Sequence, residues 1–222
     1  DAAVVCGPAA HHHGWQRDDF DALAGAVVAG HVIECSAQAT GGNYSFFEEI
    51  PGIEHLGFPW AEIAADGSSV IGKHDDTGGA VTVGTITSQI LYEIGGPDYL
   101  GPDVIAQFDT IDLDQVAADR VRISGVRGTA PTGRVKVAMN ELGGYRNDLV
   151  VALTGLDVEA KAEAALAAFW NACPNDPADF TSCTTRIVRR EHDDPMSNEA
   201  ATAELRISVK DPDERLVGRA FS

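Results

Sequence analysis

Apolar residues recur at helical spacing in three stretches of the chain, residues 20–28, 86–94 and 158–169. In each stretch they fall at intervals of three and four positions, which places them on one face of a helix. Side chains that cap helices lie at or near the start of each stretch. These caps are Asp18 and Asp19, then Thr85 or Thr87, and finally Asp157. The pattern predicts three amphipathic helices.

Other apolar residues alternate with polar ones, which is the period of a half-buried strand. Short strands are predicted at residues 1–6 and 80–83, and a hairpin at 61–71 around the Asp66-Gly67 turn. Longer strands are predicted at 104–113, 120–125, 134–140, 149–154, 184–190 and 203–210. We therefore expect an α/β or α+β fold, in which a mixed sheet packs with helices and the second half is strand-rich and largely antiparallel. The change of pattern predicts two portions, residues 1–102 and 103–222.

The charge of the chain narrows the classes of partner. Its 222 residues include 34 acidic and 16 basic side chains, giving a formal net charge of −18 at pH 7. Such a surface repels phosphate backbones and anionic lipids, so we expect neither nucleic-acid nor membrane binding. The sequence has no apolar run of membrane-spanning length, and its first residues lack the basic start of a signal peptide. These features predict a cytoplasmic protein.

Neither the cysteines nor the histidines give a recognisable metal signature. The four cysteines are scattered without a Cys-x-x-Cys pair, so we expect free thiols and no structural zinc. Three adjacent histidines occupy residues 11–13, and on a strand or loop only His11 and His13 would point the same way. A metal site formed by one of them with His31 and Glu34 has suitable ligands, but spacing alone does not distinguish it from chance. No metal ligand is therefore assigned.

The densest group of reactive side chains lies in residues 30–43, directly after the first predicted helix. If that helix continues through Glu34, then His31 and Glu34 lie one turn apart on the same face and can share a proton. An imidazole and a carboxylate together suit a general acid and a general base, which makes these two residues the catalytic candidates. The alternative is that both simply brace the helix end. Cys35 would be a nucleophile only if His31 favoured its thiolate, and buried, inert cysteines are commoner.

Two Thr-Gly-Gly turns supply the candidate binding residues. Hydrogen-bonding groups in glycine-rich turns suit a carboxylate or a thioester carbonyl, although plain turn formation explains them equally well. The first turn contributes Gln38, Thr40, Gly41, Gly42 and Asn43. The second contributes Thr77, Gly78 and Gly79, with Lys73 as the nearest cation unless it is a solvated surface lysine. Neither turn has the spacing of a nucleotide-binding loop, so the cofactor stays unknown. We expect His31 and both turns to line one solvent-reachable pocket.

Several of these motifs together resemble one protein family. They are residues 30–35, 39–43, 77–79, 89–95 and 120–125, in that order. The chain resembles the acyclic terpene utilisation protein A family, AtuA, over essentially its whole length. The resemblance implies a role in the catabolism of citronellol-type or geraniol-type acids through coenzyme A thioesters. It also implies a further lobe before Asp1 and more chain after Ser222, so the sequence is expected to be a fragment. The resemblance assigns no catalytic residues.

Two functions are compatible with these observations. In the first, the protein is a hydratase-type or lyase-type enzyme acting on an acyl-CoA or a small carboxylic acid, with His31 and Glu34 as acid and base. In the second, it is a non-catalytic subunit that binds a metabolite or assembles with a catabolic enzyme. Separation of His31, Glu34, Thr40 and Thr77, or their burial in the core, would favour the second function. We also expect a homo-oligomer, because most such metabolic proteins are symmetric assemblies.

Overall fold

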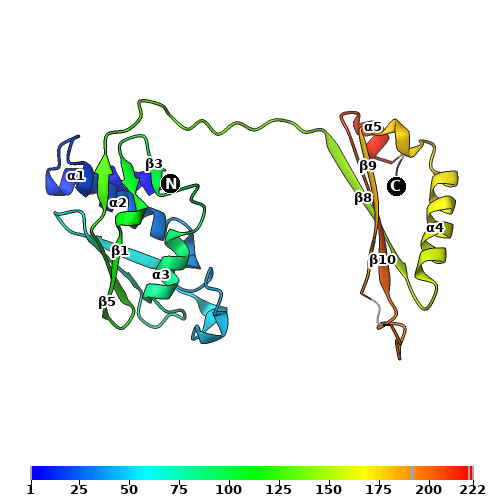
Figure 1. The fold of residues 1–222 in the computed structure, drawn as a ribbon, viewed down its shortest axis with the longest axis horizontal. Coiled ribbons are helices and arrows are strands. Elements are labelled where there is room, and N and C mark those ends of the chain that lie inside the picture. Colours follow the sequence, from blue (N-terminus) through cyan, green and yellow to red (C-terminus); the bar gives the residue numbers. More distant parts are fainter. Residues whose placement is uncertain (1, 191–192, 220, 222) are drawn as a thin grey trace. The chain divides into compact units, whose positions relative to one another are not determined.

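The computed structural model describes residues 2–190, 193–219 and 221. Contacts divide the chain into two compact units, residues 1–137 and 138–222 (Figure 1). The division therefore follows residue 137, whereas the change of sequence pattern placed a boundary after residue 102. Strands that come after residue 102 complete the sheets of the first unit, which accounts for the later division. Each unit is described by itself below.

Unit 1 is built around one helix, α2 (Phe20–Ile33). The sequence pattern predicted this helix as amphipathic, but every residue from Leu23 to Val32 is buried. A helix that is apolar on all sides is typical of a protein interior. Gly25 and Gly30 let other backbone segments approach closely, since a Cβ at these positions would lie 2.0 Å from the carbonyl oxygen of Gly67 and 2.1 Å from that of Ala2.

Two antiparallel sheets and a third helix pack around α2 in unit 1. One sheet has the order β1-β2-β6-β5, and the other has the order β3-β4-β7. The strands of the first sheet are β1 (Pro59–Ile63), β2 (Ser69–Lys73), β5 (Asp112–Ala117) and β6 (Arg120–Ser124). Those of the second are β3 (Asp98–Leu100), β4 (Ile105–Gln107) and β7 (Arg127–Thr129). Helix α3 (Val83–Ile90) packs against α2. The predicted 61–71 hairpin is confirmed as β1 and β2.

Short helical turns connect these elements. They are η1 (Ala2–Val5), η2 (Ser36–Gln38), η3 (Phe47–Glu49), η4 (Ile53–His55) and η5 (Phe108–Thr110). The predicted strand at residues 1–6 is wrong over the described residues, because η1 leads directly into α1 (Cys6–His13) and packs on α2. Asp1 lies outside the described residues. The predicted strand at 80–83 is also wrong, since Thr82 there caps α3 in place of Thr85 or Thr87.

Unit 2 is a three-stranded antiparallel sheet with a helix on one face. The sheet has the order β8-β10-β9 and consists of β8 (Tyr145–Leu153), β9 (Ser182–Val188) and β10 (Ala203–Asp211). Helix α4 (Val158–Ala172) confirms the third predicted helix and packs on the face that carries Leu205 and Ile207. A short turn, η6 (Pro177–Asp179), and a last helix, α5 (Glu214–Val217), complete the unit.

The predicted mixture of helices with largely antiparallel strands is confirmed. All three sheets pair their strands antiparallel, and the parallel component is an isolated bridge between Leu56 and Gly78. The strand predicted at residues 134–140 is wrong, because that stretch belongs to no strand in this structure. Among the residues that the structure describes, every helix is too short or too polar to span a bilayer.

Candidate functional site

His31 and Glu34 lie at the carboxyl end of α2, as the spacing of the two residues predicted. Nδ1 of His31 is 3.3 Å from Oε1 of Glu34, which is ion-pair distance, although the two groups are not aligned for a hydrogen bond. The two side chains differ sharply in access to solvent, with exposed fractions of 1% for His31 and 21% for Glu34. Glu34 is therefore the member of the pair that a ligand can reach.

Aromatic rings surround the His31 imidazole. The rings of Tyr99 and Phe108 meet it edge-on, with centroid distances of 5.2 and 5.3 Å, and stack on each other at 5.0 Å. Nε2 of His31 has no hydrogen-bond partner among the described residues. Buried polar atoms normally have a partner, so this orphan nitrogen marks the position as unusual.

A second buried side chain, Gln89 of α3, lies against the same end of α2. Its Nε2 donates to the carbonyl oxygen of His31 at 3.4 Å, and its exposed fraction is 0%. Oε1 of Gln89 has no hydrogen-bond partner within the described part of the chain. Among the described residues, the end of α2 therefore combines three buried polar atoms without a hydrogen bond in an apolar, aromatic setting: Nδ1 and Nε2 of His31 and Oε1 of Gln89.

Two tyrosines and a further carboxylate, which the sequence reasoning missed, complete this group. Burial raises the pKa of Tyr99, and the negative charges of Glu34 and Glu93 raise it further. Glu93 is also the main cause of the raised pKa of Tyr92, which Cys35 raises to a smaller degree. The negative charges of these carboxylates therefore act on both phenols. Sequence spacing could not reveal them, because Tyr99 arrives on β3, far along the chain from α2.

The two Thr-Gly-Gly turns also come together, as predicted. The amide of Ala80 donates to the carbonyl oxygen of Thr40 at 2.9 Å. Gly79 makes this approach possible with a φ of 95°, and a Cβ there would lie 2.6 Å from the same oxygen. A residue with a side chain would therefore both strain the backbone and push the turns apart.

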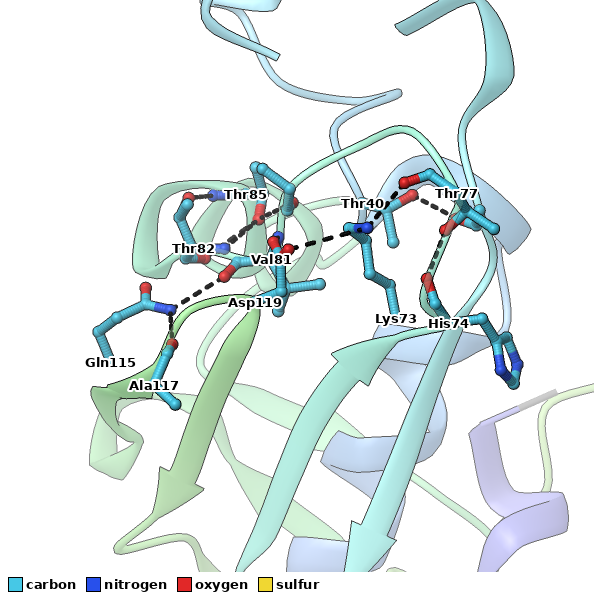
Figure 2. Close-up of polar contacts among 12 residues, drawn as sticks. Thr40, Lys73, His74, Thr77, Val81, Thr82, Thr85, Gln115, Ala117 and Asp119 are labelled. Atoms are coloured by element: carbon cyan, nitrogen blue, oxygen red, sulfur yellow. Dashed lines mark hydrogen bonds and ion pairs between the residues drawn. The ribbon is translucent and has the colours of Figure 1, made fainter. Parts of the chain in front are cut away.

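The hydroxyl and ammonium groups of the turns form hydrogen bonds within the chain (Figure 2), whereas Oε1 of Gln38 has no hydrogen-bond partner among the described residues. Thr40 is fully buried, and its hydroxyl donates to the carbonyl oxygens of Gly57 and Ala37 at 2.6 and 3.0 Å. The Thr77 hydroxyl donates to the carbonyl oxygen of His74 at 2.7 Å. Nζ of Lys73 donates to the carbonyl oxygen of Thr77 at 2.8 Å and lies 3.7 Å from Oδ2 of Asp119.

The backbone amides of the turns are engaged in the same way. Gly41 and Gly42 donate to the carbonyl oxygens of Gln38 and Ala37, while Gly78 and Gly79 donate to those of His55 and Pro51. Asn43 donates through its side chain to the carbonyl oxygen of Ser88 at 3.3 Å, which ties the first turn to α3. An anion-binding turn needs free amides. In this geometry the glycine amides instead hold the turns against neighbouring parts of the chain.

Two cavities lie away from these residues. They have volumes of about 610 and 580 Å³ and lie next to Trp15 and Phe20, at the opposite end of α2 from His31. Within the described residues, no three His, Cys, Asp or Glu side chains converge as metal ligands. The histidine triplet forms the last turn of α1 rather than a loop, and Nε2 of His13 lies 3.0 Å from the carbonyl oxygen of Ile63.

The comparisons with known proteins identify a family for the whole chain. The model of the acyclic terpene utilisation family protein AtuA matches residues 1–222. Searches of curated proteins and of solved structures found no match. The chain therefore belongs to the AtuA family, and this membership indicates a role in the utilisation of acyclic terpenes.

Proposed function

We propose that the protein catalyses acid–base chemistry on a branched acyl-CoA or a small carboxylic acid, as a hydratase or lyase does. One observation carries the proposal: a carboxylate that solvent can reach, Glu34, lies against a buried imidazole, and the ring of Tyr99 contacts the same imidazole. Removal of a hydrogen next to a thioester carbonyl needs a base, and departure of a hydroxyl group needs an acid.

Each residue of the group has a distinct role in this proposal. Glu34 is the base that takes the proton from the carbon next to the carbonyl group. Tyr99, whose hydroxyl carries its proton at neutral pH as a tyrosine ordinarily does, is the acid that protonates the leaving oxygen. His31 is a positioning residue rather than a catalytic one, because its side chain is sealed from solvent and acts on the substrate only through Glu34.

Deuterium exchange at the carbon next to the carbonyl group tests the role of Glu34 directly. The whole protein is incubated with citronellyl-CoA in D₂O, and uptake of deuterium is followed by mass spectrometry. We expect Glu34→Gln to slow the exchange at least about 100-fold, because a positioned base contributes a factor of this order. The matched control is Glu54→Gln, an exposed glutamate on η4, which should leave the exchange unchanged. Equal rates for Glu34→Gln and wild type would refute the assignment.

The role of His31 needs a measurement that a merely structural residue would not affect. In His31→Gln the carboxylate of Glu34 loses an ionisable neighbour 3.3 Å away, so we expect kcat to fall and its pH profile to shift while KM changes little. A loss of activity with an unchanged pH profile would mean that His31 only supports the fold.

A second candidate function is a non-catalytic subunit. The burial of His31 and Thr40 in the core and the hydrogen-bonded amides of the two glycine turns favour it. In that case the acid–base group would be structural, and the protein would bind a metabolite or a partner enzyme elsewhere. Growth on citronellol separates the two functions. A Glu34→Gln strain that grows like wild type would support the subunit, and a strain that fails to grow while the variant remains folded would support the enzyme.

A further inference from the structure

Residues 134–139, here called the connecting segment, expose apolar side chains in an unusual way. The exposed fractions are 73% for Val135, 68% for Val137 and 87% for Met139. No residue of the connecting segment belongs to a strand or helix. Three large apolar side chains in water within five residues mark a surface that some partner covers.

The connecting segment has the sequence of a strand even though it lies unpaired. Its apolar residues Val135, Val137 and Met139 occupy alternate positions, and Arg134 and Lys136 occupy positions between them. A strand with this pattern has one apolar face and one basic face. The whole protein carries a net charge of −18, so its surface is largely acidic. A basic strand face is therefore attracted to the surface of another copy of the same protein.

The edge strand β5 offers the complementary pattern. Among the strands that the structure describes, it pairs with β6 alone, so its other edge has backbone groups available for a further strand. Its outer face carries the exposed carboxylates of Asp112 and Asp114, neither of which has an ion-pair partner among the described residues. Leu113, and Ile111 just before the strand, face inward and pack against the core of unit 1.

We propose that the connecting segment of one protomer adds as an antiparallel strand to β5 of a second copy of this chain. One register satisfies both faces. It places Arg134 opposite Asp114 and Lys136 opposite Asp112 on the outer face, and directly opposed residues of opposite charge stabilise a strand pair. The same register sets Val135 opposite Leu113 and Val137 opposite Ile111 on the inner face.

A second copy fits better than pairing of two connecting segments with each other. Self-pairing would bring the two Arg134 and the two Lys136 side chains into one small basic patch without a carboxylate on that face. In a two-fold dimer each copy adds its connecting segment to β5 of the other copy. This reciprocal pairing neutralises four cations and four carboxylates. The inference is independent of the proposed function, because it involves neither Glu34 nor the end of α2.

Charge reversal on each side of the interface tests the proposal. Sedimentation velocity of the whole wild-type chain should show a monomer–dimer equilibrium. In R134E/K136E and in D112K/D114K like charges face each other, so we expect the dissociation constant to rise at least about tenfold in each. An equimolar mixture of the two variants should dimerise again. In the mixed dimer the reversed, acidic segment of R134E/K136E faces the reversed, basic β5 of D112K/D114K, and the unchanged basic segment of D112K/D114K faces the unchanged acidic β5 of R134E/K136E.

The mixing experiment also separates a dimer from a fold-back of the segment onto its own β5, which would leave the mixture monomeric. R17E/R219E is the matched control for R134E/K136E, since it makes the net charge more negative by the same amount at two exposed arginines outside the interface. It should dimerise like wild type, and circular dichroism should show that all variants are folded. A wild type that stays monomeric, or a mixture that does not associate, would overturn the proposal.

Discussion

Cys6 is the residue whose ionisation the fold changes most clearly. It lies at the start of α1 with an exposed fraction of 4%, and its thiol donates to the carbonyl oxygen of Leu23 at 3.5 Å. Burial raises the pKa of Cys6 from 9.0 to about 11, and the carboxylate of Asp103 contributes to the rise. The folded protein therefore holds the thiol proton more tightly than the unfolded chain does.

This difference predicts a loss of stability at high pH. Between pH 9 and 11 the folded state binds more protons at Cys6 than the unfolded state, so the free energy of unfolding falls as the pH rises through this range. The loss should reach about 2–3 kcal/mol. Urea unfolding of wild type and Cys6→Ala at pH 8 to 11 isolates the effect, because other titrating groups are common to both. Cys173→Ala is the control and should keep the wild-type slope. Identical slopes for wild type and Cys6→Ala would contradict the prediction.

At the scale of residues, local spacing predicts only contacts within one element. The approach of Glu34 to His31 could be predicted because residues three apart on a helix are neighbours. The contact of the Tyr99 ring with His31 could not be predicted, since it depends on how β3 packs in the folded protein. The same limit applies to Thr77, whose role as a binding residue stays a prediction. Its type suits a ligand, but the direction of its hydroxyl is set by the carbonyl group of His74.

At the scale of elements, the contact between α2 and the β1–β2 turn depends on a glycine. A Cβ at residue 25 would lie 2.0 Å from the backbone oxygen of Gly67. The clash is with the backbone rather than with a flexible side chain, so it cannot be relieved by a change of rotamer. We expect Gly25→Ala to lower the free energy of unfolding by about 2–3 kcal/mol, the usual cost of overpacking.

Gly95 is the matched control for Gly25. A Cβ at Gly95 meets nothing within 4 Å, and neither of its neighbours in the chain is a proline. Gly95→Ala should therefore stabilise the protein by about 0.4–1 kcal/mol, because alanine lowers the conformational entropy of the unfolded chain. Urea unfolding of both variants measures the two changes. Equal effects of the two substitutions would show that backbone entropy, rather than the approach of Gly67, controls position 25.

The elements that the sequence predicted correctly are those with a long local pattern. Helices α2 and α4 follow from apolar spacing and from Asp19 or Asp157 before them. Residues 134–140 have an equally clear strand pattern, but a strand forms only when another strand supplies hydrogen bonds. The opposite failure occurs at Ala2–Val5, where an apolar run becomes helical because it packs on α2.

At the scale of the whole molecule, the division into units depends on which strands pair, and this is not encoded locally. Strand β6 pairs with β2, about 50 positions earlier, so residues well beyond 102 belong to unit 1. In unit 2, by contrast, every strand pairing lies between Tyr145 and Asp211. Its apolar clusters, which include Leu205 and Ile207, also consist of residues from this unit.

Unit 2 should therefore fold without unit 1. We expect a fragment of residues 138–222 to show a cooperative thermal transition by circular dichroism and dispersed NMR spectra, because it contains its complete sheet and the helix that covers it. A small domain of this kind is stable by only a few kcal/mol, so the transition should be lost when a major part of the core is removed. Residues 138–202 provide that control, since they lack β10, the central strand that carries Ala203, Leu205, Ile207 and Val209 with exposed fractions of 0%. The opposite result is a longer fragment that stays unfolded and gains structure only when joined to residues 1–137. That result would show that the core of unit 2 is not sufficient for folding, and that its strands pair only after unit 1 has formed.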